Sequence, residues 1–145
     1  MSGQIGAPAE NAAMGSPAEQ VILLPAGGGR RYEMGLLTAL FKADEAETGA
    51  AYSVSEWILA PGQDGVGAHQ HEANEEIFFV LAGEPDLLIG DTWTRCAPGC
   101  FLRIPRGVMH DFRNLGEVEA RLLYIFLPGG FEREMPKIVD WFAAG

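Results

Sequence analysis

GQDGVGAHQHEANEEIFFVLAG, residues 62–83, is the stretch that decides the fold predicted for this chain. His69 and His71 are two positions apart, and side chains at that spacing share one face of a strand. Glu76 opens an apolar run that is typical of the next strand, so the turn between them brings its carboxylate back beside the histidines. Two imidazoles and a carboxylate that converge suit a divalent transition metal.

A second stretch supplies a fourth candidate ligand. Residues 99–114, GCFLRIPRGVMHDFRN, contain His110, and the chain has three histidines in all. All three therefore fall in these two stretches. A lone H-x-H is more often a pair of ordinary strand histidines, but two separate sets of candidate ligands favour a metal site.

The two stretches resemble the two motifs of the cupins. The first, H-x-H-x4-E-x6-G, is formed by His69, His71, Glu76 and Gly83. The second is formed by Pro105, Gly107, His110 and Asn114. Gly62 departs from the pattern, because six residues separate it from His69 where the family more often has five. The resemblance implies an all-β, cupin-type jelly-roll β-barrel (a double-stranded β-helix). It also implies a metal held by His69, His71, Glu76 and His110.

Length and charge limit the remaining classes. At 145 residues one domain is expected, over residues 20–145, preceded by a flexible tail over residues 1–19 that lacks the features of a secretory signal. The formal net charge of −10 disfavours nucleic acid and anionic membranes as partners. The chain has no apolar run near the ~20 residues of a membrane helix. Two cysteines without a signal sequence favour free thiols and a cytoplasmic location.

The remaining chain is typical of short strands separated by Gly and Pro turns, which favours a sandwich or barrel. We expect an acidic surface loop at residues 43–50 and a C-terminal helix at residues 136–144, packed through Met135, Ile138, Val139 and Phe142. The strands are expected at residues 20–25, 32–42, 51–60, 76–82, 86–90, 92–97, 100–104, 109–113 and 119–127.

Strand alternation assigns the side chains of residues 76–82 to two faces. If Glu76 points inward, Ile77, Phe79 and Leu81 form an apolar row on the outer face. Such a row needs a cover, which is either the N-terminal strand or a second copy of the chain, and we predict a homodimer. The same alternation places Glu75 and Asp111 outside.

The resemblance implies a function at the metal, and three alternatives stay open. The leading one is a quercetinase-like, metal-dependent dioxygenase that acts on a small, enolisable and aromatic substrate, with Glu76 as the catalytic residue that moves a proton. The second is a metal-dependent isomerase or decarboxylase, and the third is a non-catalytic small-molecule-binding module. The ion would be Fe, Mn, Ni, Cu or Zn. Candidate pocket residues are Phe78, Phe112 and Tyr124.

Overall fold

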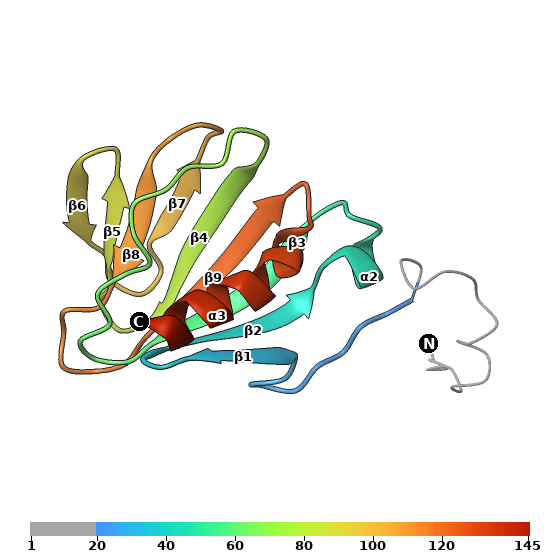
Figure 1. Ribbon diagram of the computed structural model, residues 1–145, viewed down its shortest axis with the longest axis horizontal. Coiled ribbons are helices and arrows are strands. Elements are labelled where there is room, and N and C mark those ends of the chain that lie inside the picture. The colour runs from blue at the N-terminus through green and yellow to red at the C-terminus, as the bar shows by residue number, and fades with distance from the viewer. Residues whose placement is uncertain (1–19) are drawn as a thin grey trace.

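Nine antiparallel strands form two sheets in the computed structural model, which describes residues 20–145 (Figure 1). The tail expected at residues 1–19 lies outside the described part of the chain. The strands are β1 (Arg30–Met34), β2 (Leu37–Ala43), β3 (Ser53–Leu59), β4 (Glu75–Ala82), β5 (Asp86–Ile89), β6 (Thr92–Arg95), β7 (Phe101–Ile104), β8 (His110–Arg113) and β9 (Ala120–Leu127).

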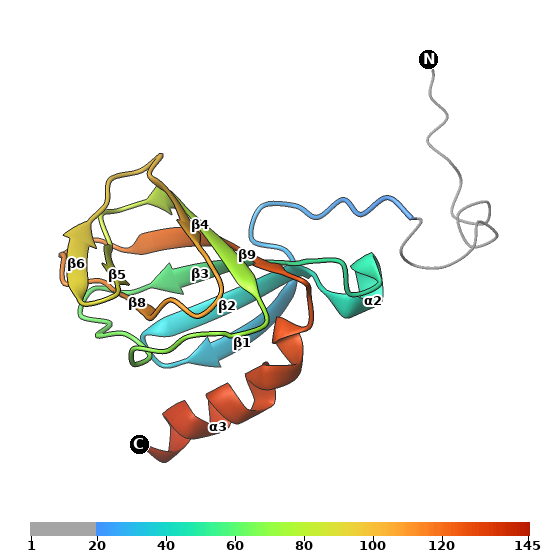
Figure 2. The same cartoon turned by 90° about the horizontal axis from the view of Figure 1, so that it is seen from above.

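The larger sheet has six strands in the order β1-β2-β3-β9-β4-β7, and the smaller has three in the order β6-β5-β8. Together they curve around one interior (Figures 1 and 2). Consecutive strands β6, β7 and β8 alternate between the two sheets. The predicted cupin-type jelly roll is therefore confirmed, as two facing sheets rather than as a ring closed by continuous hydrogen bonds.

Alternating side chains explain how β4 and β9, which are neighbours in the larger sheet, line the interior. In β9, every second residue from Ala120 is buried. In β4, Glu76, Phe78 and Val80 are buried while their neighbours are exposed or half-buried. The two strands pair in register, with Phe78 opposite Tyr124. Their inner faces thus line the interior, as strand alternation predicts.

Gly83 ends β4 at a point where no side chain fits. Its φ is +72°, and a Cβ added there would lie 2.4 Å from the Glu119 carbonyl oxygen. Glycine is therefore required for two reasons: the backbone is left-handed, and the loop that leads into β9 comes too close to leave room for a Cβ. This is the physical reason for the last position of the first motif.

Two strand predictions near the N-terminus are wrong. Residues 20–25 form no strand, and Val21 and Leu23 are almost fully exposed. Residues 32–42 form not one strand but the hairpin of β1 and β2, which turns at Gly35 with φ +71°. Glycine at that φ permits the turn that the apolar pattern conceals.

Three short helices complete the fold within residues 20–145: α2 (Glu45–Thr48), η2 (Phe131–Glu134) and α3 (Met135–Ala144). The loop expected at residues 43–50 thus contains α2, in which Asp44 and Glu47 form a capping box. The predicted C-terminal helix is confirmed as α3, which follows η2 directly and contacts β1. Its packed residues Met135, Ile138, Val139 and Phe142 face the core.

Candidate metal site and cavity

Backbone hydrogen bonds hold His69 beside His110. The amide of His69 donates to the carbonyl of His110 at 3.0 Å, and the amide of His110 donates back at 2.8 Å. The two ring centroids are 4.4 Å apart. His110 begins β8, but the expected strand at residues 69–71 is wrong, because His69 forms only an isolated bridge in a loop. A long-range pairing, not a shared strand face, brings these imidazoles together.

Asp111 fixes the loop that carries His69. Its carboxylate accepts hydrogen bonds from the amides of Val66 at 3.1 Å and Gly67 at 3.2 Å. Gly65 has φ +95°, and a Cβ there would lie 2.8 Å from the same carboxylate. The prediction that Asp111 lies outside is therefore wrong: it is on the outward side of β8, but the loop buries it.

His71 completes a cluster of three imidazoles. The amide of Gly107 donates to the His71 carbonyl at 2.9 Å, which ties the second motif to the first. The His71 ring lies edge-on to Phe126, with centroids 5.1 Å apart. One ring nitrogen from each of His69, His71 and His110 lies within 4.8 Å of the others. This spacing suits three ligands of a single ion.

The tautomers of two histidines favour metal binding. Nδ1 of His69 is 2.8 Å from the Gly67 carbonyl, and Nδ1 of His110 is 2.9 Å from the Val108 carbonyl. A carbonyl only accepts, so both Nδ1 atoms carry a proton, and in the neutral rings both Nε2 atoms keep a free lone pair. Metal-binding histidines are commonly held by a carbonyl in this way.

Buried nitrogens without partners provide a test of whether a metal fits. Nε2 of His71 and Nε2 of His110 are buried and make no hydrogen bond. Leaving a buried polar atom unsatisfied costs roughly 1–3 kcal/mol. A cation bound by both atoms would remove that cost, so these residues fit a divalent transition metal.

Glu76 lies beside the three-histidine cluster rather than within it. Its side chain is 1% exposed, and its Oε1 accepts a hydrogen bond from the Tyr124 hydroxyl at 2.6 Å. The same oxygen is 2.9 Å from Nε2 of His110, a short electrostatic contact without the alignment of a hydrogen bond. Glu76 as a fourth ligand stays a prediction.

Burial and this carboxylate together set the ionisation of the site. Burial lowers the pKa of His71, so its imidazole stays neutral. For Glu76, burial favours the neutral acid, but the contacts with His110 and Tyr124 outweigh it and the pKa is lowered. For His110, Glu76 outweighs burial and the pKa is raised. Burial and Glu76 both raise the pKa of Tyr124, which stays a donor.

A cavity of about 440 Å³ opens from the histidines. Its volume is within the range of roughly 300–1,000 Å³ for small-molecule sites. The walls are mainly aromatic, and Phe78 stacks on Tyr124 with centroids 4.7 Å apart. The lining residues are Trp57, Val66, His69, His71, Glu76, Phe78, Phe112, Tyr124, Phe131, Glu134, Lys137, Ile138, Trp141 and Phe142.

Three of these, Phe78, Phe112 and Tyr124, are the pocket residues suggested by the sequence. The sequence did not indicate that η2 and α3 form a wall of the cavity. The signal available was the spacing of Lys137 and Trp141, which are four positions apart and share a helix face. The sequence predicted only which residues of α3 pack against the core. Apolar periodicity identifies the core side of a helix but not its relation to a distant cavity.

The chain has the cupin-type fold. Residues 55–126 match the family described as "Cupin domain". An RmlC-like cupin from Shewanella frigidimarina superposes with a TM-score of 0.64 and 14% identity, covering 75% of this chain and 92% of that one. A predicted oxalate decarboxylase from Thermotoga maritima gives 0.66 and 17%, covering 74% and 99%. These findings support assignment to the cupin superfamily.

Two curated relatives are closer in sequence. Protein SchB from Streptomyces halstedii is 37% identical over 67 residues, covering 46% of this chain and 48% of that protein. A protein from Streptomyces cyaneus named "Polyketide synthase CurC" is 34% identical over 92 residues, covering 57% and 58%. The chain thus spans about half the length of the curated relatives it matches.

Proposed function

We propose that this chain is a metal-dependent enzyme of the dioxygenase type, with a small, enolisable aromatic molecule as its substrate. The observation that carries the proposal is a three-imidazole cluster beside an aromatic-walled cavity that His69, His71 and Glu76 line. The name of the CurC relative supports the substrate class, because polyketides carry enolisable ketones. The quercetinase-like subtype is part of the proposal.

The proposed ligands are His69, His71, His110 and Glu76. A bound Fe, Mn, Ni, Cu or Zn ion supplies Lewis acidity to a hydroxyl or enolate oxygen and, where it is redox active, access to dioxygen chemistry. The proposed site contains no thiolate ligand, and four protein ligands leave open positions on an octahedral ion. Both features favour a catalytic role over a structural one.

The chain's own residues bind the substrate and move its proton. The aromatic walls hold a flat ring and exclude water, which strengthens electrostatic interactions at the histidines. Oε2 of Glu76 has no partner among the described residues, whereas Oε1 is held by Tyr124 and His110. Glu76 is therefore positioned to accept the proton of a substrate hydroxyl while Tyr124 fixes its orientation.

Oxygen uptake by the reconstituted protein tests this proposal. The Fe, Mn, Ni, Co and Cu forms are incubated with flavonols and other enolisable aromatics, and oxygen consumption and product mass are followed. We expect turnover in at least one form. Glu76→Gln should keep much of the metal, since the amide oxygen still coordinates weakly, yet lose most of the turnover, by about 100-fold or more.

Glu75→Gln is the matched control. Glu75 adjoins Glu76 but lies on the outer side of β4, where it pairs with Arg103. Its loss should leave turnover unchanged. Product formed without oxygen uptake would show that the chain is an isomerase or decarboxylase and not a dioxygenase. If every metal form is inert and a ligand co-purifies unchanged, the chain is a small-molecule-binding module.

We also propose that two copies of the chain form a homodimer through the outer face of the larger sheet. Phe79 of β4 pairs with Phe101 of β7 and with Leu123 of β9 across that face. Phe79 is 37% exposed, Leu81 43% and Phe101 61%. A second copy would cover this apolar row.

A cytoplasmic location is proposed on the state of the two cysteines. Cys96 and Cys100 are both free, which suits a reducing compartment. No helix among residues 20–145 is long and apolar enough to cross a membrane.

A further inference from the structure

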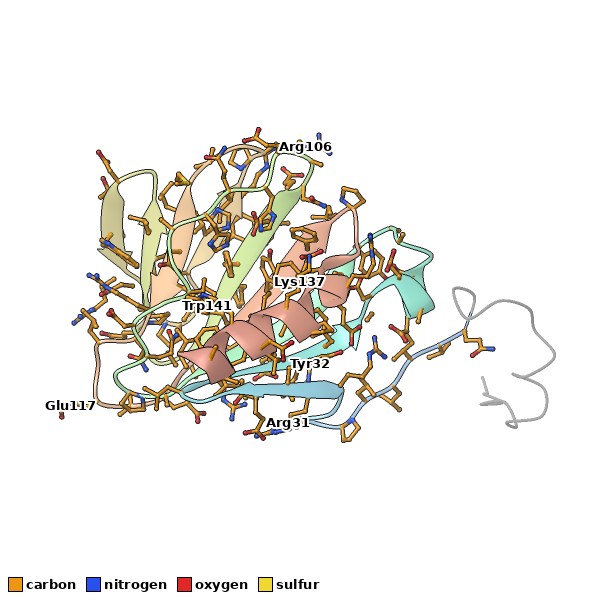
Figure 3. All side chains as sticks on the ribbon, viewed as in Figure 1. Arg31, Tyr32, Arg106, Glu117, Lys137 and Trp141 are labelled. Carbon is orange, nitrogen blue, oxygen red and sulfur yellow. The ribbon has the colours of Figure 1, made fainter. Side chains whose placement is uncertain are left out.

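Glu134 and Lys137 are polar lining residues of the cavity besides the histidines and Glu76, and they come from the C-terminal part of the chain. Most of the other lining side chains are aromatic or aliphatic. Figure 3 shows Lys137 and Trp141 together on α3. A ligand that contacts both the histidines and α3 would therefore need one group for the histidines, an apolar body and a polar group for Lys137.

Lys137 is the only lysine or arginine that lines the cavity. In the part of the chain that the structure describes, Lys137 and Arg106 are the only cations without an ion pair. The other cations pair with carboxylates. A chain of net charge −10 has an excess of acidic partners, so an unpaired ammonium group at a cavity is a site for an external anion.

Trp141 gives the α3 wall of the cavity an aromatic surface. It lies one helical turn after Lys137 and is 62% exposed, although it is among the largest apolar side chains. Its ring meets Phe142 edge-on, with centroids 4.8 Å apart, which limits its rotation. An exposed aromatic ring beside a cation can stack on a ring that bears an acidic substituent.

We propose that Lys137 and Trp141 form a recognition point that selects aromatic ligands bearing a carboxylate. The inference rests on the proposed function for the class of ligand and adds the acidic group. A single ammonium group without an arginine fork matches the one charge of a carboxylate better than a phosphate.

Calorimetric titration with two anthraquinones tests the inference without turnover. Rhein carries a carboxylate, and aloe-emodin carries a neutral hydroxymethyl group in its place. Both are titrated into the zinc-loaded protein, which is redox-silent, and into the metal-free protein. Wild type should bind rhein more tightly than aloe-emodin. Because the preference arises at α3, it should persist without metal.

Substitutions at Lys137 should remove that preference. Lys137→Gln is expected to weaken the binding of rhein by about fivefold, which is the upper end for a partly solvated ion pair. The affinity for aloe-emodin should stay unchanged. Lys137→Glu should weaken the binding of rhein by about tenfold or more. Arg31→Gln removes the same charge from β1, outside the cavity, and should change neither affinity. Equal effects of Lys137→Gln and Arg31→Gln would overturn the inference.

Trp141→Ala should weaken the binding of both anthraquinones alike, by up to about tenfold, because stacking does not depend on the carboxylate. Unchanged far-ultraviolet circular dichroism in each variant excludes loss of α3 as the cause. A preference for rhein that is insensitive to Lys137, or binding of neither anthraquinone to either form, overturns the inference. If the preference depends on Lys137 but no metal form consumes oxygen with any substrate, the proposed function fails and the recognition point stands.

Discussion

Tyr124 is the residue that holds the carboxylate of Glu76 in place. Its hydroxyl is buried and donates to Oε1 at 2.6 Å. We expect Tyr124→Phe to lower the free energy of unfolding of the metal-free protein by about 1–3 kcal/mol, because a buried carboxylate loses a donor. Urea unfolding measures the change. Tyr52→Phe, at an exposed tyrosine, should stay within about 0.5 kcal/mol of wild type, and an equal loss there would contradict the argument.

We predict that the three histidines determine whether the protein binds metal. His110→Ala, or the double substitution His69→Ala/His71→Ala, should lower the metal content of the purified protein from about one ion per chain to a small fraction, because each removes ligands of a single ion. Elemental analysis of protein prepared without a metal-affinity tag measures it. Gln70→Ala, between the two loop histidines, should retain the metal. Stoichiometric metal in the double variant would rule out this site.

The residues of the site were easier to predict than the way the chain positions them. The spacing of His69, His71 and His110 within two motifs indicated one cluster, and the structure brings the three together. The local reason was different, since pairing between His69 and His110 replaces the expected strand. Such a pairing links residues 41 positions apart, and strand periodicity describes only neighbours in sequence.

Asp44 joins α2 to the helices that wall the cavity. Its carboxylate accepts hydrogen bonds from the amides of Gly130 and Glu132, each at 2.6 Å. Asp44→Ala should lower the free energy of unfolding by about 2–3 kcal/mol, because the Gly130 amide is buried and would lose its acceptor. Amide hydrogen exchange should quicken over residues 131–144.

The matched control for Asp44 is Asp140→Ala. Asp140 is exposed on α3 itself, so its removal should leave both the unfolding free energy and the exchange rates near those of wild type. Exchange over residues 131–144 that is unchanged in Asp44→Ala would show that η2 and α3 are held by their apolar contacts alone.

At the scale of the elements, alternation and turn residues predicted the strands from β3 onward. β4 and β9 show the clearest alternation, and each has a paired strand on both sides. The hairpin of β5 and β6 turns at Gly90-Asp91, a dipeptide that suits a two-residue turn. At the N-terminal side, composition favoured a strand at residues 20–25, but composition alone does not determine whether a segment pairs.

The outer face of the larger sheet determines the predicted size of the assembly. Light scattering at micromolar concentration should give about twice the 15.6 kDa of one chain. Phe101→Glu places a charge in the apolar row and should shift the protein to the monomer, because burying an unpaired carboxylate costs several kcal/mol. Thr92→Glu, at an exposed position on β6 of the smaller sheet, is the control. A wild-type mass near 15.6 kDa would contradict the homodimer.

The wall made by η2 and α3 also has a place in the order of synthesis. A ribosome makes His69, Glu76 and His110 before it makes any residue of the wall, and chains begin to fold from the N-terminal side as they emerge. The proposed metal ligands therefore precede Lys137 and Trp141 in the order of synthesis. If a metal binds before α3 docks, selection of the ion does not depend on the wall that is proposed to select the organic ligand.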